Sequence, residues 1–549
     1  MITVELKQLI TKACEQAGFS DVEVKLEHPD DLVNGDYASN VALMLAKQVG
    51  QAPKDVAEKI KTNFASNSLI KKIEVAGPGF LNFFLNDRFF TDRLKIILAQ
   101  GDSYGQNKDV EGYKVMVEYT DPNPFKAFHI GHLMSNSIGE AISRIAEASG
   151  AEVKRACYQG DVGMHVAKAL YGLKAGQNLM TAYAFGSKAY DENETAKAQI
   201  IEFNKKIYNR NDEEINKLYD GGRAESLEQF ETIYQKLGTK FDFNFFESEV
   251  AGFGKELVEQ NIDTVFTNSD GAVVYAGEKD GLHTRVFINS EGLPTYEAKE
   301  LGLAKIKHDT YPYDYSIVVT ANEITEYFKV LLAALKQIYP ELAGKTRHVP
   351  HGMLRLPTGK MSSRTGEVIT AESLIEEVKQ KIATKVKEAK KESNLDDATL
   401  EQVAIGAIKY SILKQDITKD IIFDLEKSIS FEGNSGPYLQ YTYARTQSVL
   451  AKATTEGLMI DAAKVEVPGL VEKLLTRYPE IVYKAGENLA PHHLTTYLTE
   501  LASAFNAYYA SHKIVGGEAG GYRLALSAAV GQTLKNGLKL LGLATPERM

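Results

Sequence analysis

The chain has 549 residues, of which 44% are hydrophobic and 25% charged, and its formal net charge is −10. This length exceeds the size at which a single hydrophobic core stops growing, so several domains are expected. The 63 basic and 73 acidic residues exclude a globally basic nucleic-acid-binding protein, although a binding face needs only a local excess of lysine and arginine.

The two cysteines, Cys14 and Cys157, lie far apart and form no CxxC motif. They argue against a disulfide framework and are typical of a reducing compartment. No segment reaches the roughly 20 apolar residues needed to cross a bilayer, and the first residues lack the apolar core of a signal peptide. We therefore expect a cytoplasmic protein that does not engage a membrane.

Residues 1–87 mix helical and strand patterns. Leu6, Leu9, Ile10 and Ala13 share one helical face, and 73–85 predicts two short strands around a Gly-Pro-Gly turn. We expect a small α+β domain here and a linker over 88–112.

The next unit begins with a strand pattern at 113–120, which the sequence DPNP ends. An amphipathic helix follows, with Leu133, Ile138, Ile142 and Ile145 on one stripe, and strand character returns at 153–159. Strand, helix and strand in this order predict a βαβ unit and a parallel sheet. We expect a Rossmann-type doubly wound α/β domain over 113–370. It should contain a helical insertion at about 165–240 and further strands at 272–277, 284–289 and 315–319.

From residue 371 onward nearly every segment is compatible with a helix. We divide this part into a helical connecting region, 371–430, and an all-α helical bundle, 431–549. The predicted fold class is thus an α/β catalytic domain between an N-terminal α+β domain and a C-terminal helical bundle.

Two histidines, His129 and His132, follow the strand at 113–120 at the point where the next helix begins. Ligands of doubly wound sheets bind off the carboxyl ends of the strands, and a helix N-terminus attracts anions. Two imidazoles there could donate hydrogen bonds to phosphate oxygens, and Gly131 would let a ligand approach the backbone. Taken alone, the pair is also compatible with helix capping or packing, whereas a zinc site would need a third ligand.

A second stretch, GKMSSRTGEV at 359–368, is a basic loop bounded by glycines and suited to closing over a polyphosphate. It is not a Walker A loop, and the nearest approach to that motif, at 343–346, has Tyr339 in place of its first glycine.

Together, FHIGHL (128–133) and GKMSSR (359–364) resemble the HIGH and KMSKS signatures of class I aminoacyl-tRNA synthetases. Further stretches resemble the arginyl-tRNA synthetase family in particular. Residues 431–445 are similar to the head of its anticodon-binding domain, 522–549 to its C-terminus, and 35–47 with 75–85 to its N-terminal domain.

This resemblance implies an arginine–tRNA ligase, which activates L-arginine with ATP to arginyl-adenylate and transfers it to the 3′-terminal ribose of tRNA(Arg). It also implies that Mg²⁺ accompanies ATP, that activation waits for bound tRNA and that the protein is a monomer without a resident metal. Two alternatives stay open: a class I synthetase for another amino acid, and a non-catalytic tRNA-binding paralogue.

By the same resemblance, four sets of residues carry the function. The catalytic set is His129, His132 and Lys360. The ATP-binding set adds Phe128, Gly131, Met361, Ser362, Ser363 and Arg364. The arginine-binding set is Glu118, Asn123, Tyr296, Glu300 and Glu323. The tRNA-binding set is Tyr438, Gln440, Tyr441, Arg445 and Met549. Carboxylates and amides suit a planar guanidinium, and aromatic and polar side chains suit unpaired bases.

The chain departs from the family pattern at five positions. Ser363 replaces the second lysine of KMSKS, and Glu300 replaces an aspartate. Glu323 and Glu326 stand where glutamine and histidine are common, and Asp121 stands where serine or alanine is frequent. The added carboxylates fit a cationic substrate.

Overall fold

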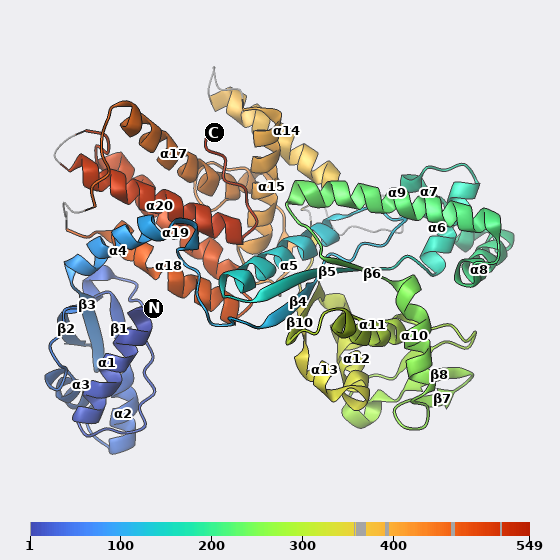
Figure 1. Cartoon of the computed structure of the whole chain (residues 1–549), viewed down its shortest axis with the longest axis horizontal. Helices are drawn as coiled ribbons and strands as arrows, with labels where there is room; N and C mark the ends of the chain where they lie inside the picture. The colour runs from blue at the N-terminus through green and yellow to red at the C-terminus, as the bar shows by residue number, and fades with distance from the viewer. Residues whose placement is uncertain (1, 356, 358–368, 390–394, 463–466, 517–518) are drawn as a thin grey trace.

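The computed structural model describes residues 2–355, 357, 369–389, 395–462, 467–516 and 519–549. Lys360, Met361, Ser362, Ser363 and Arg364, which were predicted to contact ATP, lie outside the described residues. Figure 1 shows a small N-terminal domain beside a helical bundle, with a central sheet between that bundle and a helical insertion. Within the described ranges, no helix is both long and apolar enough to cross a membrane.

The N-terminal domain is α+β, as predicted. Its antiparallel sheet has the strand order β1-β3-β2. The predicted helical face is buried through Leu6, Ile10 and Ala13. The elements are α1 (Ile2–Gln16), η1 (Leu32–Asn34), β1 (Tyr37–Ser39), α2 (Val41–Val49), α3 (Pro53–Thr62), β2 (Ile70–Ala76) and β3 (Phe80–Leu85).

The central sheet is parallel and has the order β11-β10-β4-β5-β6, which confirms the doubly wound α/β prediction. The chain moves outward from β4 through β5 to β6 and then returns to β10 and β11 on the other side. The order therefore reverses at β4 and β10, and such a switch point opens a crevice at the carboxyl ends of the strands. The strands are β4 (Lys114–Glu118), β5 (Glu152–Gln159), β6 (Phe243–Phe246), β10 (Tyr315–Ala321) and β11 (Thr346–His351).

The strand patterns at 272–277 and 284–289 form strands, but these lie outside the parallel sheet. They pair antiparallel with one another and with a short third strand. Periodicity identifies a strand but not its partner, because pairing depends on residues distant in sequence. These strands are β7 (Thr267–Ser269), β8 (Ala272–Tyr275) and β9 (Arg285–Ile288).

Helices cover the sheet and form the predicted insertion. The linker contains α4 (Asp87–Gln100) and η2 (Gly101–Ser103). The insertion consists of α6 (Met164–Lys174), α7 (Leu179–Glu192), α8 (Glu194–Asn209) and α9 (Glu213–Leu237). The remaining helices of this part are α5 (Ile130–Ala148), α10 (Glu247–Glu259), η3 (Gly277–Asp280), α11 (Tyr296–Thr310), η4 (Asn322–Ile324), α12 (Thr325–Ile338) and α13 (Pro340–Lys345).

The C-terminal part is helical as predicted, apart from a short parallel pair, β12 (Leu354–Arg355) with β13 (Ile421–Ile422). Its helices are α14 (Ala371–Ala389), α15 (Asp397–Leu413), α16 (Leu425–Ser428), α17 (Gly436–Thr455), α18 (Leu470–Glu487), α19 (His492–Ser511) and α20 (Gly520–Leu540).

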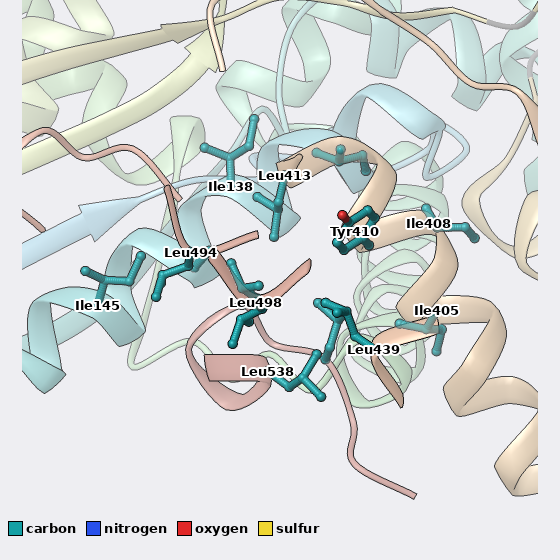
Figure 2. Close-up of a cluster of buried hydrophobic side chains, with 14 of the residues drawn as sticks. Ile138, Ile145, Ile405, Ile408, Tyr410, Leu413, Leu439, Leu494, Leu498 and Leu538 are labelled. Atoms are coloured by element: carbon teal, nitrogen blue, oxygen red, sulfur yellow. The ribbon is translucent and has the colours of Figure 1, made fainter. Parts of the chain in front are cut away.

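Helix α5 lies between the sheet and this bundle and is buried at 14 of its 19 residues. Ile138 and Ile145 on α5 belong to the same apolar core as Leu413, Leu494 and Leu498 of the bundle (Figure 2). Two domains thus share one core, and α5 is fixed by both.

Two basic side chains, Lys409 of α15 and Arg144 of α5, tie the insertion to the bundle. Lys409 Nζ donates to the carbonyl oxygens of Leu237 (2.6 Å) and Gly542 (3.0 Å). Arg144 of α5 donates to the carbonyl oxygens of Gly238 (2.8 Å) and Lys539 (3.0 Å). The ends of α9 and α20 therefore both rest on basic side chains, and the charge of Arg144 is the one that a helix C-terminus favours.

Gly139 sets how closely α5 approaches the end of β4, because a Cβ there would lie 2.2 Å from the Tyr119 ring. We predict that Gly139→Ala lowers the free energy of unfolding by about 1–3 kcal/mol, as overpacking does, and lowers the thermal midpoint. Gly221→Ala on α9 is the control, since nothing lies within 4 Å of its Cβ position. Equal thermal midpoints for the two variants would contradict this account.

Candidate functional site

A cavity of about 900 Å³ opens at the carboxyl ends of β4 and β10, as the strand order requires. Its walls come from the turn after β4, the first turn of α5, the end of β10 and the segment after β11. Six residues singled out from the sequence line it: Asp121, Asn123, His129, Gly131, His132 and Glu323.

The two histidines cap helix α5 together. His129 is the N-cap residue, and its Nδ1 accepts a hydrogen bond from the Gly131 backbone N–H at 3.1 Å. His132 Nδ1 accepts from the His129 backbone N–H at 3.2 Å. The rings stack with their centroids 3.7 Å apart. Two imidazoles thus take the place of the serine and glutamate that usually form a capping box.

This cap sets the protonation of both rings. A ring nitrogen that accepts a backbone N–H carries no proton, so each neutral imidazole holds its proton on Nε2. Burial, and next the charge of Lys126, lower the pKa of His129 to about 4. Burial and the neighbouring His129 lower the pKa of His132 well below its usual value. At neutral pH both rings are uncharged donors.

The histidine cap also explains why a glycine stands at position 131 and a phenylalanine at position 128. A Cβ on Gly131 would lie 2.9 Å from the His129 ring, so this glycine makes room for the histidine itself. Phe128, predicted to bind ATP, is buried and packs its ring 5.2 Å from that of His132. The Phe128 side chain does not line the cavity, and it packs against the His132 ring instead.

Residues that flank the predicted KMSKS-like loop meet the same helix turn. Arg355 lines the cavity, and the Ile369 carbonyl oxygen accepts a hydrogen bond from the Ile130 N–H. The Ala371 N–H donates to the Phe128 carbonyl oxygen. Both described ends of the loop therefore lie beside the histidines.

The turn after β4 contains three non-glycine residues with positive φ: Thr120 (82°), Asp121 (47°) and Phe125 (67°). Such conformations cost free energy and persist where surrounding contacts hold them. The Thr120 N–H donates to Ser135 Oγ, and the Tyr158 N–H donates to Asp121 Oδ1 at 2.7 Å. The structure thus holds this turn in a conformation that its sequence alone does not favour.

A buried cluster of carboxylates lies beside the cavity. Glu118 is buried and forms an ion pair with Lys307, with 2.6 Å between Oε2 and Nζ. Burial and the nearby Glu118 raise the pKa of Glu300 well above its usual value, and the same two causes raise the pKa of Asp121. Glu247 forms a second buried pair with Lys299 at 2.6 Å.

The carboxylate cluster has more acceptors than cations to match them. No hydrogen bond or ion pair joins the Glu300 carboxylate to another described residue. The Tyr158 hydroxyl is buried without a hydrogen-bond partner in the described chain, and Glu247 and Glu300 raise its pKa after burial itself. Buried polar groups without partners are costly, so this cluster suits a cationic ligand that donates several hydrogen bonds.

Two further residues predicted to bind arginine, Asn123 and Tyr296, differ in how deeply they are buried. Asn123 Oδ1 approaches Gly160 so closely that a Cβ there would be 2.2 Å away, which places the amide at the end of β5. Tyr296, which would be a core residue on its own, is 57% exposed at the start of α11. Sequence reasoning missed Tyr158, Lys307 and Glu247, because single buried residues in strands and helices carry no local signal.

The residues predicted to bind tRNA fall into two groups. On α17 the Arg445 guanidinium lies over the rings of Tyr441 (4.8 Å) and Tyr509 (5.1 Å) and donates to Asn506 Oδ1. Asn506 also donates to the Tyr438 hydroxyl. Tyr509 and Asn506, both on α19, were missed because only the folded bundle brings that helix beside α17.

Gln440 and Met549 belong to the second group. Gln440 is fully buried and donates to the carbonyl oxygens of Gln402 and Ala544. Its amide nitrogen holds the C-terminal segment in place, and its contact with tRNA stays a prediction. Met549 packs against the main core, and its contact with tRNA stays a prediction.

No group of three or more His, Cys, Asp or Glu in the described ranges could hold a metal ion. His129 and His132 each use Nδ1 for the helix cap, which leaves Nε2 of each ring open to a ligand.

Comparison with known families assigns the whole architecture. Residues 93–425 match the model of the catalytic domain of class I (R) tRNA synthetases. Residues 439–549 match the DALR anticodon-binding domain, and 4–85 match the N-terminal domain of arginyl-tRNA synthetases. A parallel sheet with a switch-point cavity beside a helical anticodon-binding domain thus makes this a class I aminoacyl-tRNA synthetase.

Individual relatives show which family of class I synthetases the chain belongs to. The arginine–tRNA ligase of Fusobacterium nucleatum is 32% identical over 94% of this chain and 93% of its own length. That of Levilactobacillus brevis is 31% identical over the full length of both. Thermus thermophilus arginyl-tRNA synthetase superposes with a TM-score of 0.75 at 25% identity, covering both chains fully. The chain belongs to the arginyl-tRNA synthetase family, whose members are ligases.

The histidine cap yields a prediction for NMR of ¹⁵N-histidine-labelled protein. His129 and His132 should show the Nε2–H tautomer and no protonation at pH 6, with His129 titrating near pH 4. Because an unfolded histidine titrates near 6.5, their contribution to stability should be complete above that pH and fall as pH drops towards 4. His129→Asn and His132→Asn assign the signals. Titration of both rings near 6.5 would contradict the buried cap.

Proposed function

We propose that the protein joins L-arginine to tRNA(Arg) in two ATP-dependent steps at the cavity between β4 and β10. This proposal rests on two groups of side chains that lie at one cavity. One group is the pair of neutral histidine donors at a helix N-terminus, and the other is a carboxylate cluster with too few cations to pair with it. The first suits a triphosphate and the second suits a guanidinium.

In the first step the arginine carboxylate attacks the α-phosphate of ATP, and pyrophosphate leaves with the bonding electrons of the broken P–O bond. No covalent enzyme intermediate is needed, since positioning and charge stabilisation dominate phosphoryl chemistry. We assign the Nε2–H groups of His129 and His132 to the phosphate oxygens on which charge develops. In the second step a terminal ribose hydroxyl of the tRNA takes the arginyl group and releases AMP.

The phosphates need cations as well as neutral donors. Lys126 is the cation whose charge depresses the pKa of both histidines, so it stands near their side of the cavity. We propose that Lys360 and Arg364 join it there with Met361, Ser362 and Ser363, and the positions of Arg355 and Ile369 at the cavity support this. Mg²⁺ would arrive on the ATP phosphates, which suits an ion that keeps most of its own waters.

For the amino acid, we assign the guanidinium to Glu118 and Glu300 and the amino end to Asn123. Tyr296 would cover the substrate from the exposed start of α11, and Glu323 would add charge at the cavity edge. Arginine presents five guanidinium donors, enough to satisfy the free Glu300 carboxylate and the unpartnered Tyr158 hydroxyl.

Figure 1 displays the bundle on one side of the sheet, so a tRNA held there must extend back to the cavity. We propose that Tyr438, Tyr441 and Arg445, together with Asn506 and Tyr509, bind unpaired anticodon bases by stacking and hydrogen bonding. We further propose that the enzyme acts as a monomer in the cytoplasm.

The test of the function is aminoacylation of unfractionated tRNA with each of the twenty amino acids, ATP and magnesium. We expect charging with arginine alone. Charging with a different amino acid would keep the class and overturn the carboxylate assignment. Binding of tRNA without any charging would favour the non-catalytic paralogue.

The histidines can be tested without disturbing the helix. In His129→Asn and His132→Asn the amide oxygen can still accept the capping N–H, while the Nε2 donor is lost. Removing one such donor should lower kcat roughly 10²–10³-fold, with a thermal midpoint near that of the wild type. His493→Asn is the control, because His493 stacks on His492 at the start of α19 and does not line the cavity. A nearly unchanged kcat in both site variants would refute the donor role.

For the anticodon interface, we predict that Tyr509→Ala raises the KM for tRNA roughly 5- to 100-fold, the loss of one stacked base, without changing the KM for arginine or ATP. Tyr315→Ala provides the comparison, since this tyrosine is 47% exposed at the start of β10 and contacts the ring of Tyr113. The interface is misplaced if the KM for tRNA stays the same in Tyr509→Ala.

A further inference from the structure

The N-terminal domain has a hydrophobic core of its own. The buried apolar residues between Ile2 and Phe90 form one cluster, and that cluster is separate from the main core, which the sheet and the bundle share. Two domains of one chain move relative to each other by default unless a large apolar interface joins them. The position of this domain against α18 is therefore set by the linker helix α4 and by a few polar side chains.

Two residues of the N-terminal domain bond to one carboxylate of α18. The Tyr37 hydroxyl donates to Glu480 Oε1 at 2.5 Å, and His28 Nε2 lies 3.0 Å from Glu480 Oε2. Burial, and next the charge of Glu480, raise the pKa of Tyr37 well above its usual value, so this hydroxyl stays a donor. Asp36 forms an ion pair with Lys473 of α18 at 2.9 Å. We call His28, Tyr37 and Glu480 the histidine latch.

The hydrogen bonds of His28 require a proton on each ring nitrogen. Nδ1 lies 2.8 Å from the Asp36 carbonyl oxygen, which can only accept. Nε2 faces the Glu480 carboxylate, which in its ionised form also only accepts. A neutral imidazole has a single N–H, so it can make only one of these two bonds. The charged imidazolium form of His28 makes both.

Three further cations face this interface from the helices packed against the domain. Lys473 is paired with Asp36, while the charges of Arg477 on α18 and Arg93 on α4 act on nearby tyrosines. Among the described residues, His28 is the only basic side chain that forms an ion pair with Glu480. The proton on His28 therefore decides whether the N-terminal domain is bonded to this carboxylate by a charged pair.

The interface beside the latch is loosely packed. A cavity of about 190 Å³ lies there, lined by Ile2, Arg93 and Glu480 among others. Arg93 Nε is buried without a hydrogen-bond partner in the part of the chain that the structure describes. Protein interiors are normally close-packed and their polar groups paired. Separation of the domains would therefore break few contacts besides the latch and the Asp36–Lys473 pair.

We propose that protonated His28 fixes the N-terminal domain against α18 through Glu480, and that loss of this proton releases the domain. The inference goes beyond the proposed function and rests on the interface contacts alone. Because the docked state holds the proton, docking is favoured at low pH and weakens as the pH rises. Histidine is the side chain whose charge ordinarily changes between about pH 5 and 8, so the domain should respond to pH near neutrality.

The distance between the domains can be measured in the full-length protein by double electron–electron resonance. Lys54→Cys on α3 and Glu500→Cys on α19 carry the spin labels, since both positions are exposed, and the native Cys14 and Cys157 are buried. We expect one distance at about pH 6 and a second, longer distance at about pH 8.5. The ratio of docked to released protein should fall by at most about tenfold per pH unit, the limit for one proton.

Two variants of the latch should respond in opposite ways. In Glu480→Gln the amide N–H can donate to the neutral Nε2 of His28 while the amide oxygen still accepts from Tyr37, so the domain should stay docked at both pH values. His28→Leu removes both bonds of the ring and should show the released distance at both. His283→Leu is the control, because it changes an exposed histidine outside this interface, and it should follow the wild type.

The proposal is overturned if the wild-type distances do not change with pH, or if Glu480→Gln shows the same pH dependence as the wild type. A docked His28→Leu variant at both pH values would overturn it as well. If His28→Leu is too unstable to measure, the comparison of Glu480→Gln with the wild type decides. None of these distances depends on aminoacylation, so failure of the latch and failure of the proposed function are distinguished.

Discussion

The N-terminus of helix α5 imposes the constraint on which the site depends. The first backbone N–H groups of a helix have no partner within the helix, and here two of them are satisfied by the imidazoles of His129 and His132. Because Nδ1 of each ring accepts a hydrogen bond, the proton stays on Nε2. The same bonds that begin the helix therefore prepare two neutral donors, and burial keeps them uncharged.

Electrostatics shapes the other half of the site. The pairs Glu118–Lys307 and Glu247–Lys299 are buried, and such pairs add little net stability because both charges lose water. Removal of one partner is costly, because it leaves the other charge buried and unpaired. Glu300 and Asp121 are left with raised pKa values and no bonded cation among the described residues. A cationic ligand would relieve this imbalance, because it stabilises the charged form of both carboxyl groups.

Helix α5 also connects the site to the rest of the chain. Its apolar face shares a core with the bundle (Figure 2), and Arg144 bonds to carbonyl oxygens at the ends of α9 and α20. On the other side of the bundle, Glu480 of α18 accepts hydrogen bonds from His28 and Tyr37 of the N-terminal domain. The N-terminal domain, the insertion and the bundle thus all contact helices that pack against one another, α5, α18 and α20. These contacts hold domains that are far apart in sequence in fixed positions.

The sequence by itself determined the local features and the family. Apolar periodicity identified the βαβ unit around 113–159, and the position of His129 and His132 after a strand placed them at the cavity that the sheet opens. Resemblance to known motifs, rather than physical reasoning, selected Glu300 and Tyr296. The inferences on fold and family succeed because periodicity and motif spacing depend on residues close in sequence, and the roles of Glu300 and Tyr296 stay predictions.

Only the tertiary structure decided the contacts between distant segments. It paired Lys307 with Glu118, brought Asn506 and Tyr509 beside Arg445, left the Tyr158 hydroxyl unpartnered and buried Gln440 against the C-terminal segment. It also separated β8 and β9 from the parallel sheet. In each case the deciding partner lies tens to hundreds of residues away, and burial and charge compensation depend on that partner rather than on local pattern.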